Sequence, residues 1–212
     1  MNINKVDEIL EYWFPKNNEA DYDKWFMKSQ NYDEEIKEKF KKILDESEKG
    51  KGFEWLMNKN SFVAHIILMD QFSRHIYRNN GDSFKNDKGV LIFTELGIDI
   101  YMNDLQGYEL MFAFMPYMHT ELITYQEKGL KIFEKMLNIQ KCKLTNSNLS
   151  QKSIENLDNN IKILNDMKNY IDLHHDVIKR FGRFPKRNHL LNRESTPEEL
   201  NYILNEAKDR PF

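Results

Sequence analysis

Hydrophobic side chains recur at intervals of three and four residues along most of the chain, which is the spacing of one buried face of an α-helix. The longest such stripe covers residues 153–181. Gly182 follows it as a helix-ending residue, and Lys179 and Arg180 lie in the last turn, where the helix dipole favours cations. Strand-like alternation is scarce, and the chain holds only eight glycines and five prolines. The pattern therefore predicts an all-α fold of about eight helices with no convincing strand.

Shorter periodic segments predict the other helices. Residues 61–77 are apolar nearly all round at first, which is typical of a buried helix, and they turn polar from Asp70 onward. Thr120 is the expected N-cap of a helix over 121–138, with Glu121 in the first turn, where the helix dipole favours an acid. Further helices are expected over residues 6–14, 32–44, 87–103 and, after the start signal Thr196-Pro197-Glu198-Glu199, to about 207.

Composition fits a single domain of residues 1–212. Hydrophobic residues make up 40% of the chain, enough to bury a core, and the net charge of −3 favours neither nucleic acid nor an anionic membrane. The polar stretch 138–150 is expected to be an internal loop. The longest apolar stretches, 62–69 and 111–118, are far shorter than the roughly 20 residues of a membrane span. We therefore expect a cytoplasmic protein without nucleic-acid or membrane partners, and its oligomeric state stays open.

Known cofactor motifs are missing from the sequence. Cys142 is the only cysteine, so neither an internal disulfide nor a multi-cysteine zinc site can form, and we expect a spectator thiol near a helix end. The chain also lacks the H-E-x-x-H, G-x-S-x-G, Walker A and G-x-G-x-x-G patterns. The sequence therefore predicts no cofactor and no resident metal.

Arginine is used sparingly, which makes its positions informative. The chain has 24 lysines but only seven arginines, so lysine is the cation used where any positive charge suffices. A guanidinium offers a planar fork of donors that an ammonium group cannot imitate. These positions therefore need fork geometry, either for carboxylates inside the fold or for an anionic ligand. The arginines are Arg74, Arg78, Arg180, Arg183, Arg187, Arg193 and Arg210.

Spacing separates the arginines that have a nearby acid from those that lack one. Asp70 lies four residues before Arg74, and Asp176 lies four before Arg180, so both arginines can pair on their own helix. Arg183 and Arg187 follow Gly182, off the regular helix, and have no local acid. Those two are the better candidates for an external anion.

Histidines and acids supply a second set of candidates. His119 and Glu121 lie at the expected helix start in an H-x-E order, but zinc deaminases with this order also need a P-C-x-x-C segment, which one cysteine cannot provide. His174 belongs to the apolar stripe and is expected to be a core residue. His175 lies off the stripe and can face Asp172. A metal site built from His119, Glu121 and His175 is a further alternative.

Five blocks carry a family resemblance over nearly the whole chain: LEYWF (10–14), DQFSR (70–74), FMPYMHTE (114–121), RFGRFPKRN (180–188) and NRESTPEE (192–199). Their order resembles the bacterial domain of unknown function 924 family. The resemblance implies an all-α fold of the tetratricopeptide-like superfamily, and it carries no established activity. The chain departs from the family pattern at Ser73, where proline is common, and at His75, where asparagine is common.

We expect the polar residues at separate helix ends to converge on one cleft between helices. Its arginines would bind the carboxylate or phosphate of a small molecule or a peptide. The residues of this hypothesis are Asp70, Gln71, Arg74, His119, Glu121, His175, Arg180, Arg183 and Arg187.

Two other functions stay open. The protein could be a hydrolase of an anionic substrate, with Glu121 or His119 as general base and the arginines holding the developing negative charge. It could instead be a protein-interaction scaffold without a pocket. A scaffold predicts an exposed apolar groove where the other two functions predict a polar site.

Overall fold

The computed structural model describes residues 3–14, 20–50, 53–145 and 148–207, and no strand occurs within these ranges. The all-α prediction is therefore confirmed. The α-helices are α1 Ile3–Trp13, α2 Tyr22–Phe26, α3 Gln30–Glu48, α4 Lys59–Ile66, α5 Ser73–Ile76, α6 Asp87–Tyr101, α7 Tyr108–His119, α8 Ile123–Leu144, α9 Gln151–Phe181 and α10 Pro197–Asn201. Short 3₁₀ or π segments are η1 Phe53–Leu56, η2 Ile67–Phe72, η3 Gly81–Phe84, η4 Pro185–Arg187 and η5 Tyr202–Glu206.

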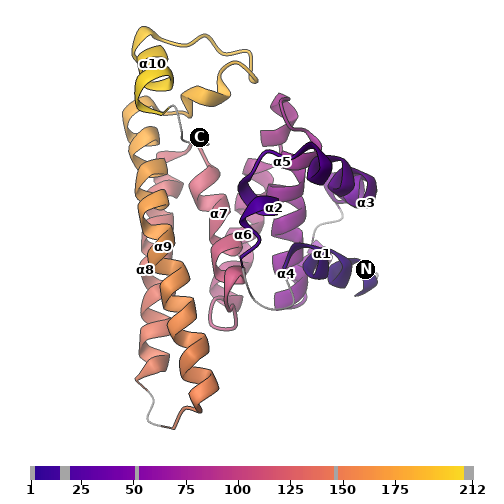
Figure 1. The fold of residues 1–212 in the computed structure, drawn as a ribbon, viewed down its shortest axis with the longest axis vertical. Coiled ribbons are helices and arrows are strands. Elements are labelled where there is room, and N and C mark those ends of the chain that lie inside the picture. Colours follow the sequence, from indigo (N-terminus) through magenta and orange to yellow (C-terminus); the bar gives the residue numbers. More distant parts are fainter. Residues whose placement is uncertain (1–2, 15–19, 51–52, 146–147, 208–212) are drawn as a thin grey trace.

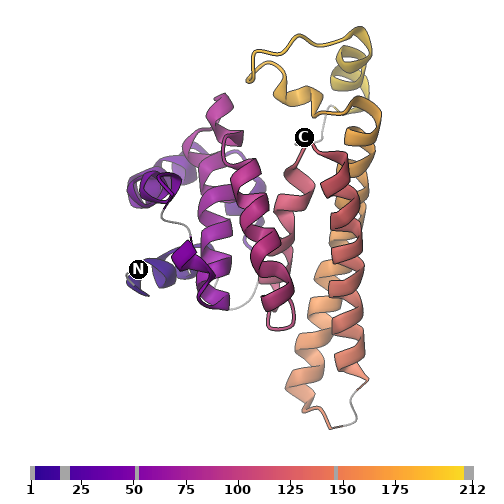
Figure 2. The ribbon, with the colours of Figure 1, turned by 180° about the vertical axis from the view of Figure 1, so that it is seen from behind.

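Three parts of the fold lie side by side in Figure 1. Helices α1 to α6 form one cluster, α8 and α9 form a long antiparallel hairpin, and α7 lies between them and contacts both. The segment after α9 runs from the end of the hairpin back towards α5, as Figures 1 and 2 show. There the backbone of Gly81 lies against Leu190, because a Cβ at residue 81 would come within 2.6 Å of the Leu190 carbonyl oxygen. The C-terminal segment therefore touches the N-terminal cluster directly.

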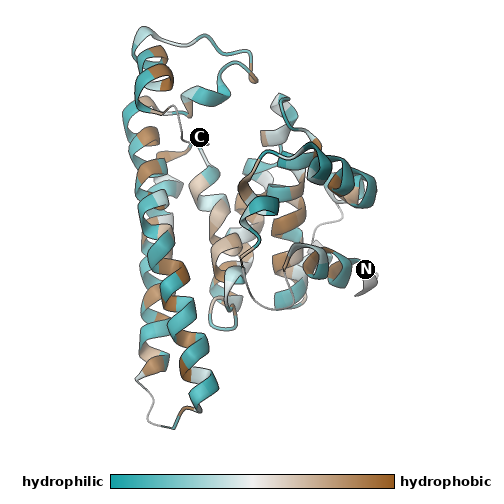
Figure 3. Cartoon of the chain, viewed as in Figure 1, coloured by the Kyte–Doolittle hydropathy of each residue, from teal (hydrophilic) through white to brown (hydrophobic). Residues whose placement is uncertain are grey.

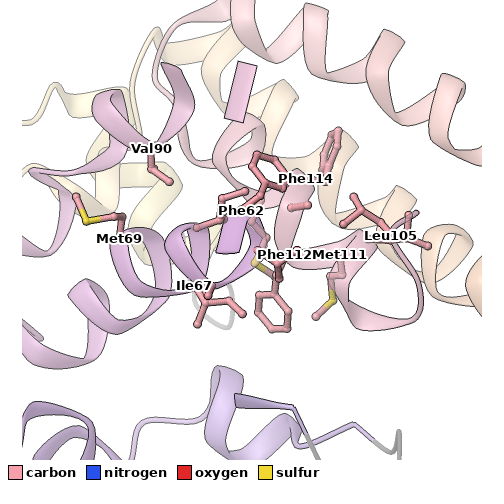
Figure 4. Packing of buried hydrophobic residues seen from close by; sticks show 14 of the residues in the cluster. Phe62, Ile67, Met69, Val90, Leu105, Met111, Phe112 and Phe114 are labelled. Carbon is pink, nitrogen blue, oxygen red and sulfur yellow. The ribbon is translucent and has the colours of Figure 1, made fainter. Parts of the chain in front are cut away.

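The hydrophobic core is centred on α7, where every residue from 110 to 118 is buried. Figure 4 shows Phe112 and Phe114 of this helix packed with Phe62 and Ile67 from the N-terminal cluster. In Figure 3 the α8–α9 hairpin is hydrophilic with recurring hydrophobic patches, which is the banding of amphipathic helices. Within the described ranges, no helix combines the length and the hydropathy needed to cross a membrane.

Periodicity does not predict α7, and the reason lies in this burial. The helix is apolar all round, so no polar face marks its period, and Pro116 lies inside it.

The prediction that Thr120 is the N-cap of the following helix is wrong. Thr120 is the C-terminal neighbour of α7, and α8 starts only at Ile123. Glu121 consequently lies in the connection between two helices.

The predicted loop over 138–150 is wrong for its first half, because α8 continues to Leu144. Gln140 in this stretch is fully buried and accepts a 3.0 Å hydrogen bond from Asn160 of α9. Packing against α9 therefore holds a polar sequence in a helix.

Two other predicted helix caps are confirmed. Gly182 ends α9 with a φ of 69°, and Thr196 forms a capping box with Glu199 at the start of α10.

The helix predicted over 61–77 is confirmed, but it contains a π segment in its middle. α4, η2 and α5 follow one another from Lys59 to Ile76, and η2 holds Asp70 and Gln71. Such π segments are rare and occur frequently at functional sites. Both side chains are buried, so η2 delivers a carboxylate and an amide to the interior.

Buried histidines predict how stability depends on pH. His65 is 4% exposed, packs 4.2 Å from the Phe93 ring, and has no partner for Nδ1 in the described structure. Burial lowers the pKa of His65 to about 3, so the unfolded chain binds the proton more readily, and stability falls as the pH drops below the ordinary histidine value. The free energy of unfolding should fall between pH 7 and pH 5 in the wild type. In His65→Leu this fall should be smaller by about 2 kcal/mol, as measured by urea titration at the two pH values.

The exposed His189 supplies the matched control for this measurement. His189→Gln should keep the full pH dependence of the wild type. An unchanged pH dependence in His65→Leu would contradict the assignment of His65 as a buried neutral histidine.

Candidate functional site

A buried carboxylate, Asp70, lies at the centre of the candidate site. Arg74 Nη2 donates to it at 3.1 Å, and the Gln71 amide also donates to it. His119 Nδ1 lies 2.8 Å from Asp70 Oδ1. Burial alone would raise the pKa of Asp70, but His119 and Arg74 outweigh it and lower the pKa. Asp70 is therefore ionised, so it can only accept, and the proton of this contact is on His119 Nδ1. The predicted Asp70–Arg74 pair is confirmed.

A second acid, Asp87, links Arg74 to Arg187. Asp87 is the first residue of α6, and its two oxygens accept hydrogen bonds from Arg74 at 3.0 Å and from Arg187 at 2.8 Å. Arg74 also donates to the Ser83 carbonyl at 3.1 Å. One carboxylate thus joins α5, α6 and η4. As expected, Arg187 has no acidic partner close to it in the sequence, and its partner Asp87 comes from 100 residues away.

The Arg187 guanidinium lies between two aromatic rings. Its central carbon is 4.4 Å from the centroid of the Phe84 ring and 4.4 Å from that of Phe184. Burial lowers the pKa of Arg187, Asp87 opposes this change, and Arg74 adds to it. A guanidinium has five N–H donors, and in the described structure Arg187 uses one of them, towards Asp87.

Glu121 belongs to a second polar cluster next to the first. Arg193 donates to both of its oxygens, at 2.6 and 2.9 Å, and the Phe184 N–H donates to it at 2.8 Å. Burial would raise the pKa of Glu121, but these hydrogen bonds lower it. Arg193 also binds the Asn188 side chain at 3.0 Å. The Glu121 carboxylate therefore holds the segment after α9 in place and is fully engaged.

Arg183 and Arg180 lie further out and pair with acids of the C-terminal segment. Arg183 donates two hydrogen bonds of 2.6 and 2.8 Å to the Glu199 carboxylate, and this contact lowers the pKa of Glu199 to about 2. Arg180 binds Glu198 at 2.9 Å and Glu206 at 2.7 Å. The predicted pairing of Arg180 with Asp176 is therefore wrong. Arg183 has no local acid, as expected, and takes its partner from 16 residues away. Both arginines line an open hollow of about 370 Å³.

The histidines divide between the two sides of α9. His174 is buried, its Nδ1 lies 2.7 Å from the Tyr170 carbonyl, and its ring is 6.2 Å from that of His119, so its predicted core position is confirmed. His175 lies 3.8 Å from Asp176, whereas the expected partner Asp172 binds Lys168. Across the described residues, no three histidines, cysteines or acids are grouped to hold a metal, so the alternative site of His119, Glu121 and His175 is not assembled.

The structure brings part of the predicted set together. Asp70, Gln71, Arg74, His119 and Arg187 share one network through Asp87. Glu121 joins Arg193 and Asn188 in the adjacent cluster, and Asn188 contacts Glu199, the partner of Arg183. Arg180 and His175 lie outside both. Asp87 and Arg193 are site residues that the sequence did not predict as such, because their partners Arg187 and Glu121 lie 100 and 72 residues away in the chain.

The fold and site define an all-α protein in which the segment after α9 meets the N-terminal helices through acids and arginines. We call this group of Asp70, Arg74, Asp87, Arg187, Glu121 and Arg193 the polar belt. The chain belongs to the family described as bacterial protein of unknown function (DUF924), which matches residues 9–207. It is similar in fold to the protein of unknown function ATU0120 from Agrobacterium tumefaciens, with a TM-score of 0.70 and 24% identity over 94% of this chain and 96% of that one. A comparison with curated proteins found no match.

Removing the Asp87 charge should destabilise the protein strongly. Asp87→Asn leaves Arg74 and Arg187, whose side chains are 20% and 9% exposed, close together without the carboxylate between them. Breaking a buried pair in this way costs about 3 kcal/mol of unfolding free energy, measurable by urea titration. The control is Asp172→Asn, which removes an exposed pair with Lys168 and should cost less than about 1 kcal/mol. Equal losses in the two variants would contradict the central position of Asp87.

Proposed function

We propose that the protein binds a small anionic ligand, a molecule or a peptide end that carries a carboxylate or a phosphate, at Arg187, which shares one hydrogen-bond network with His119 through Asp87, Arg74 and Asp70. The observation that supports this proposal is the state of the Arg187 guanidinium. It contacts the rings of both Phe84 and Phe184 and uses one hydrogen bond, to Asp87, within the described residues. Its remaining donors are oriented in advance, which reduces the entropy that binding an anion would cost.

The neighbouring groups support an anion at this position more than a cation. Arg74 adds a second positive charge close by and, with burial, lowers the pKa of Arg187 against the effect of Asp87, so a further negative group at Arg187 would favour its charged form. His119 donates from Nδ1 to Asp70, which leaves Nε2 as an acceptor for a hydroxyl of the ligand. Asp70 and Gln71 would then act as supports that orient His119 and Arg74.

The outer arginines fit this proposal less well. Arg183 uses its fork on Glu199, and Arg180 binds two acids, so an anion would have to displace carboxylates that line the same hollow. The proposed binding set therefore narrows to Arg187, Arg74 and His119.

We also infer a tetratricopeptide-like order of the helices, which the family resemblance implies. Consecutive helices that pack as antiparallel pairs, α6 with α7 and α8 with α9, support this inference. In this arrangement the first residue of α6, Asp87, and the last residue of α7, His119, would lie at the polar belt.

Thermal shift with inorganic phosphate and with citrate tests the anion site. A ligand that binds only the folded protein should raise the melting temperature in proportion to the logarithm of its concentration. Arg187→Lys keeps the charge but loses the fork, so its affinity should fall at least roughly tenfold, the value of one charge-assisted hydrogen bond. Arg180→Lys, in the exposed outer pairs, should bind as the wild type does. No shift in the wild type with any carboxylate or phosphate compound, or equal affinities in the two variants, would overturn the proposal.

A second candidate function is hydrolysis of an anionic substrate, and the Asp70–His119 contact favours it. An ionised carboxylate that holds the Nδ1 proton fixes the tautomer in which Nε2 is a free base. Burial lowers the pKa of His119, against the pull of Asp70, so the imidazole is neutral at pH 7 and can accept a proton. Glu121 is poorly suited to the role of base, because both of its oxygens accept hydrogen bonds from Arg193.

The hydrolase candidate makes its own prediction. With nitrophenyl phosphate and anionic nitrophenyl esters as probes, His119→Gln should lower kcat about 10²-fold to 10⁴-fold, the range for a general base. Glu121→Gln should change kcat little once its fold is verified by circular dichroism. Absence of turnover in the wild type, or full turnover in His119→Gln, would remove this candidate and leave the anion site untouched.

A further inference from the structure

Helix α6 carries an exposed hydrophobic stripe on the side away from the core. Ile92, Leu96 and Ile100 are 49%, 49% and 61% exposed, and they lie four residues apart, so they stand one above the other on a single face. Figure 2, which views the molecule from behind, shows α6 on the near side of the N-terminal cluster. Large apolar side chains that are grouped on one exposed face mark an interaction surface more often than single ones do.

Charges of opposite sign stand at the two ends of this stripe. Lys88 precedes it and Asp104 follows it, and both side chains are exposed. Neither forms an ion pair in the described structure, although the neighbouring acids Glu95 and Asp99 are paired with Lys128 and Lys135 of α8. Lys88 and Asp104 therefore lack ion-pair partners in the described structure, whereas Glu95 and Asp99 between them have such partners.

The positions of these residues are symmetric about Leu96. Ile92 and Ile100 lie four residues on either side of it, and Lys88 and Asp104 lie eight residues on either side, about 12 Å along the helix axis. The Asp104 and Leu105 N–H groups both donate to the Tyr101 carbonyl, so the helical turn continues to this end of the stripe. A face that is apolar at its centre and oppositely charged at its ends is complementary to an antiparallel copy of itself.

We propose that this face binds a second copy of the chain, with α6 packed antiparallel against α6 about a twofold axis at Leu96. Ile92 would then contact Ile100 of the partner subunit, and Lys88 would pair with Asp104 of the partner subunit. Gly89 near the Lys88 end has open space where a Cβ would stand, so the two backbones can approach closely there. The stripe follows a row of residues four apart on both helices, so the helices would cross at about −50°, the angle at which two such rows lie along each other.

The size of the surface sets the strength of this contact. Stable dimers usually bury more than about 1,200 Å², which is more than three side chains on one helix provide. Beside the stripe, α8 offers a shallow hollow of about 630 Å³ that includes Leu130 and Ile139, and the Lys135–Asp99 pair joins the two features. We expect the dimer to be reversible and to depend on protein concentration.

Sedimentation velocity over a range of concentrations tests the proposal on the full chain. The wild type should shift from monomer to dimer as concentration rises, and Leu96→Glu should stay monomeric, because two carboxylates would meet on the twofold axis. The matched control is Leu204→Glu, which changes an apolar residue that is 68% exposed on η5, and it should dimerise as the wild type does. Both positions are exposed, so an unchanged melting temperature should accompany each substitution.

A charge exchange tests the register. Lys88→Asp and Asp104→Lys should each raise the dissociation constant roughly tenfold, because each creates two like-charged contacts per dimer. The double variant Lys88→Asp/Asp104→Lys should return it to within about threefold of the wild type. A wild type that remains monomeric at every concentration, dimerisation of Leu96→Glu, or a double variant no better than the single ones would each overturn the proposal.

Discussion

One shared carboxylate, that of Asp87, connects the two ends of this fold. It accepts from Arg74 on α5 and from Arg187 on η4, so a segment near the C-terminus is tied to the N-terminal cluster. The attraction is effective because its members are shielded from water, and each charge would be costly to bury alone. Together with the contacts of Glu121 to Phe184 and Arg193, this bridge positions the segment after α9.

Most charged groups of the belt have their hydrogen-bonding capacity filled, and one group, the Arg187 guanidinium, does not. Asp70 and Glu121 each accept several hydrogen bonds, and Arg193 donates to Glu121, Asn188 and the Phe184 carbonyl, so these residues shape the site. Arg187 is buried against two aromatic rings, yet it makes one hydrogen bond in the described structure. A partly unsatisfied guanidinium in one network with a carboxylate-oriented histidine is a suitable starting point for recognising an anion or for moving a proton.

Spacing in the sequence predicted one ion pair of the candidate site correctly and another incorrectly. The scarcity of arginine correctly pointed to positions that need fork geometry, and Asp70 and Arg74 do pair on one helix. The same reasoning paired Arg180 with Asp176, whereas packing of the C-terminal segment supplies Glu198 and Glu206 instead. Local spacing shows which acids are near in the chain, and it contains no information about acids that packing brings from elsewhere.

The sequence by itself determined the all-α class, the amphipathic helices such as α9, and the ends marked by Gly182 and Thr196, because periodicity and caps are local properties of the chain. The family was also recognisable from its five blocks. Only the tertiary structure decided the extent of α7 and α8, the π segment η2, and the acid to which each arginine is bound. Those features depend on which surfaces meet when the helices pack, and that is a property of the whole fold.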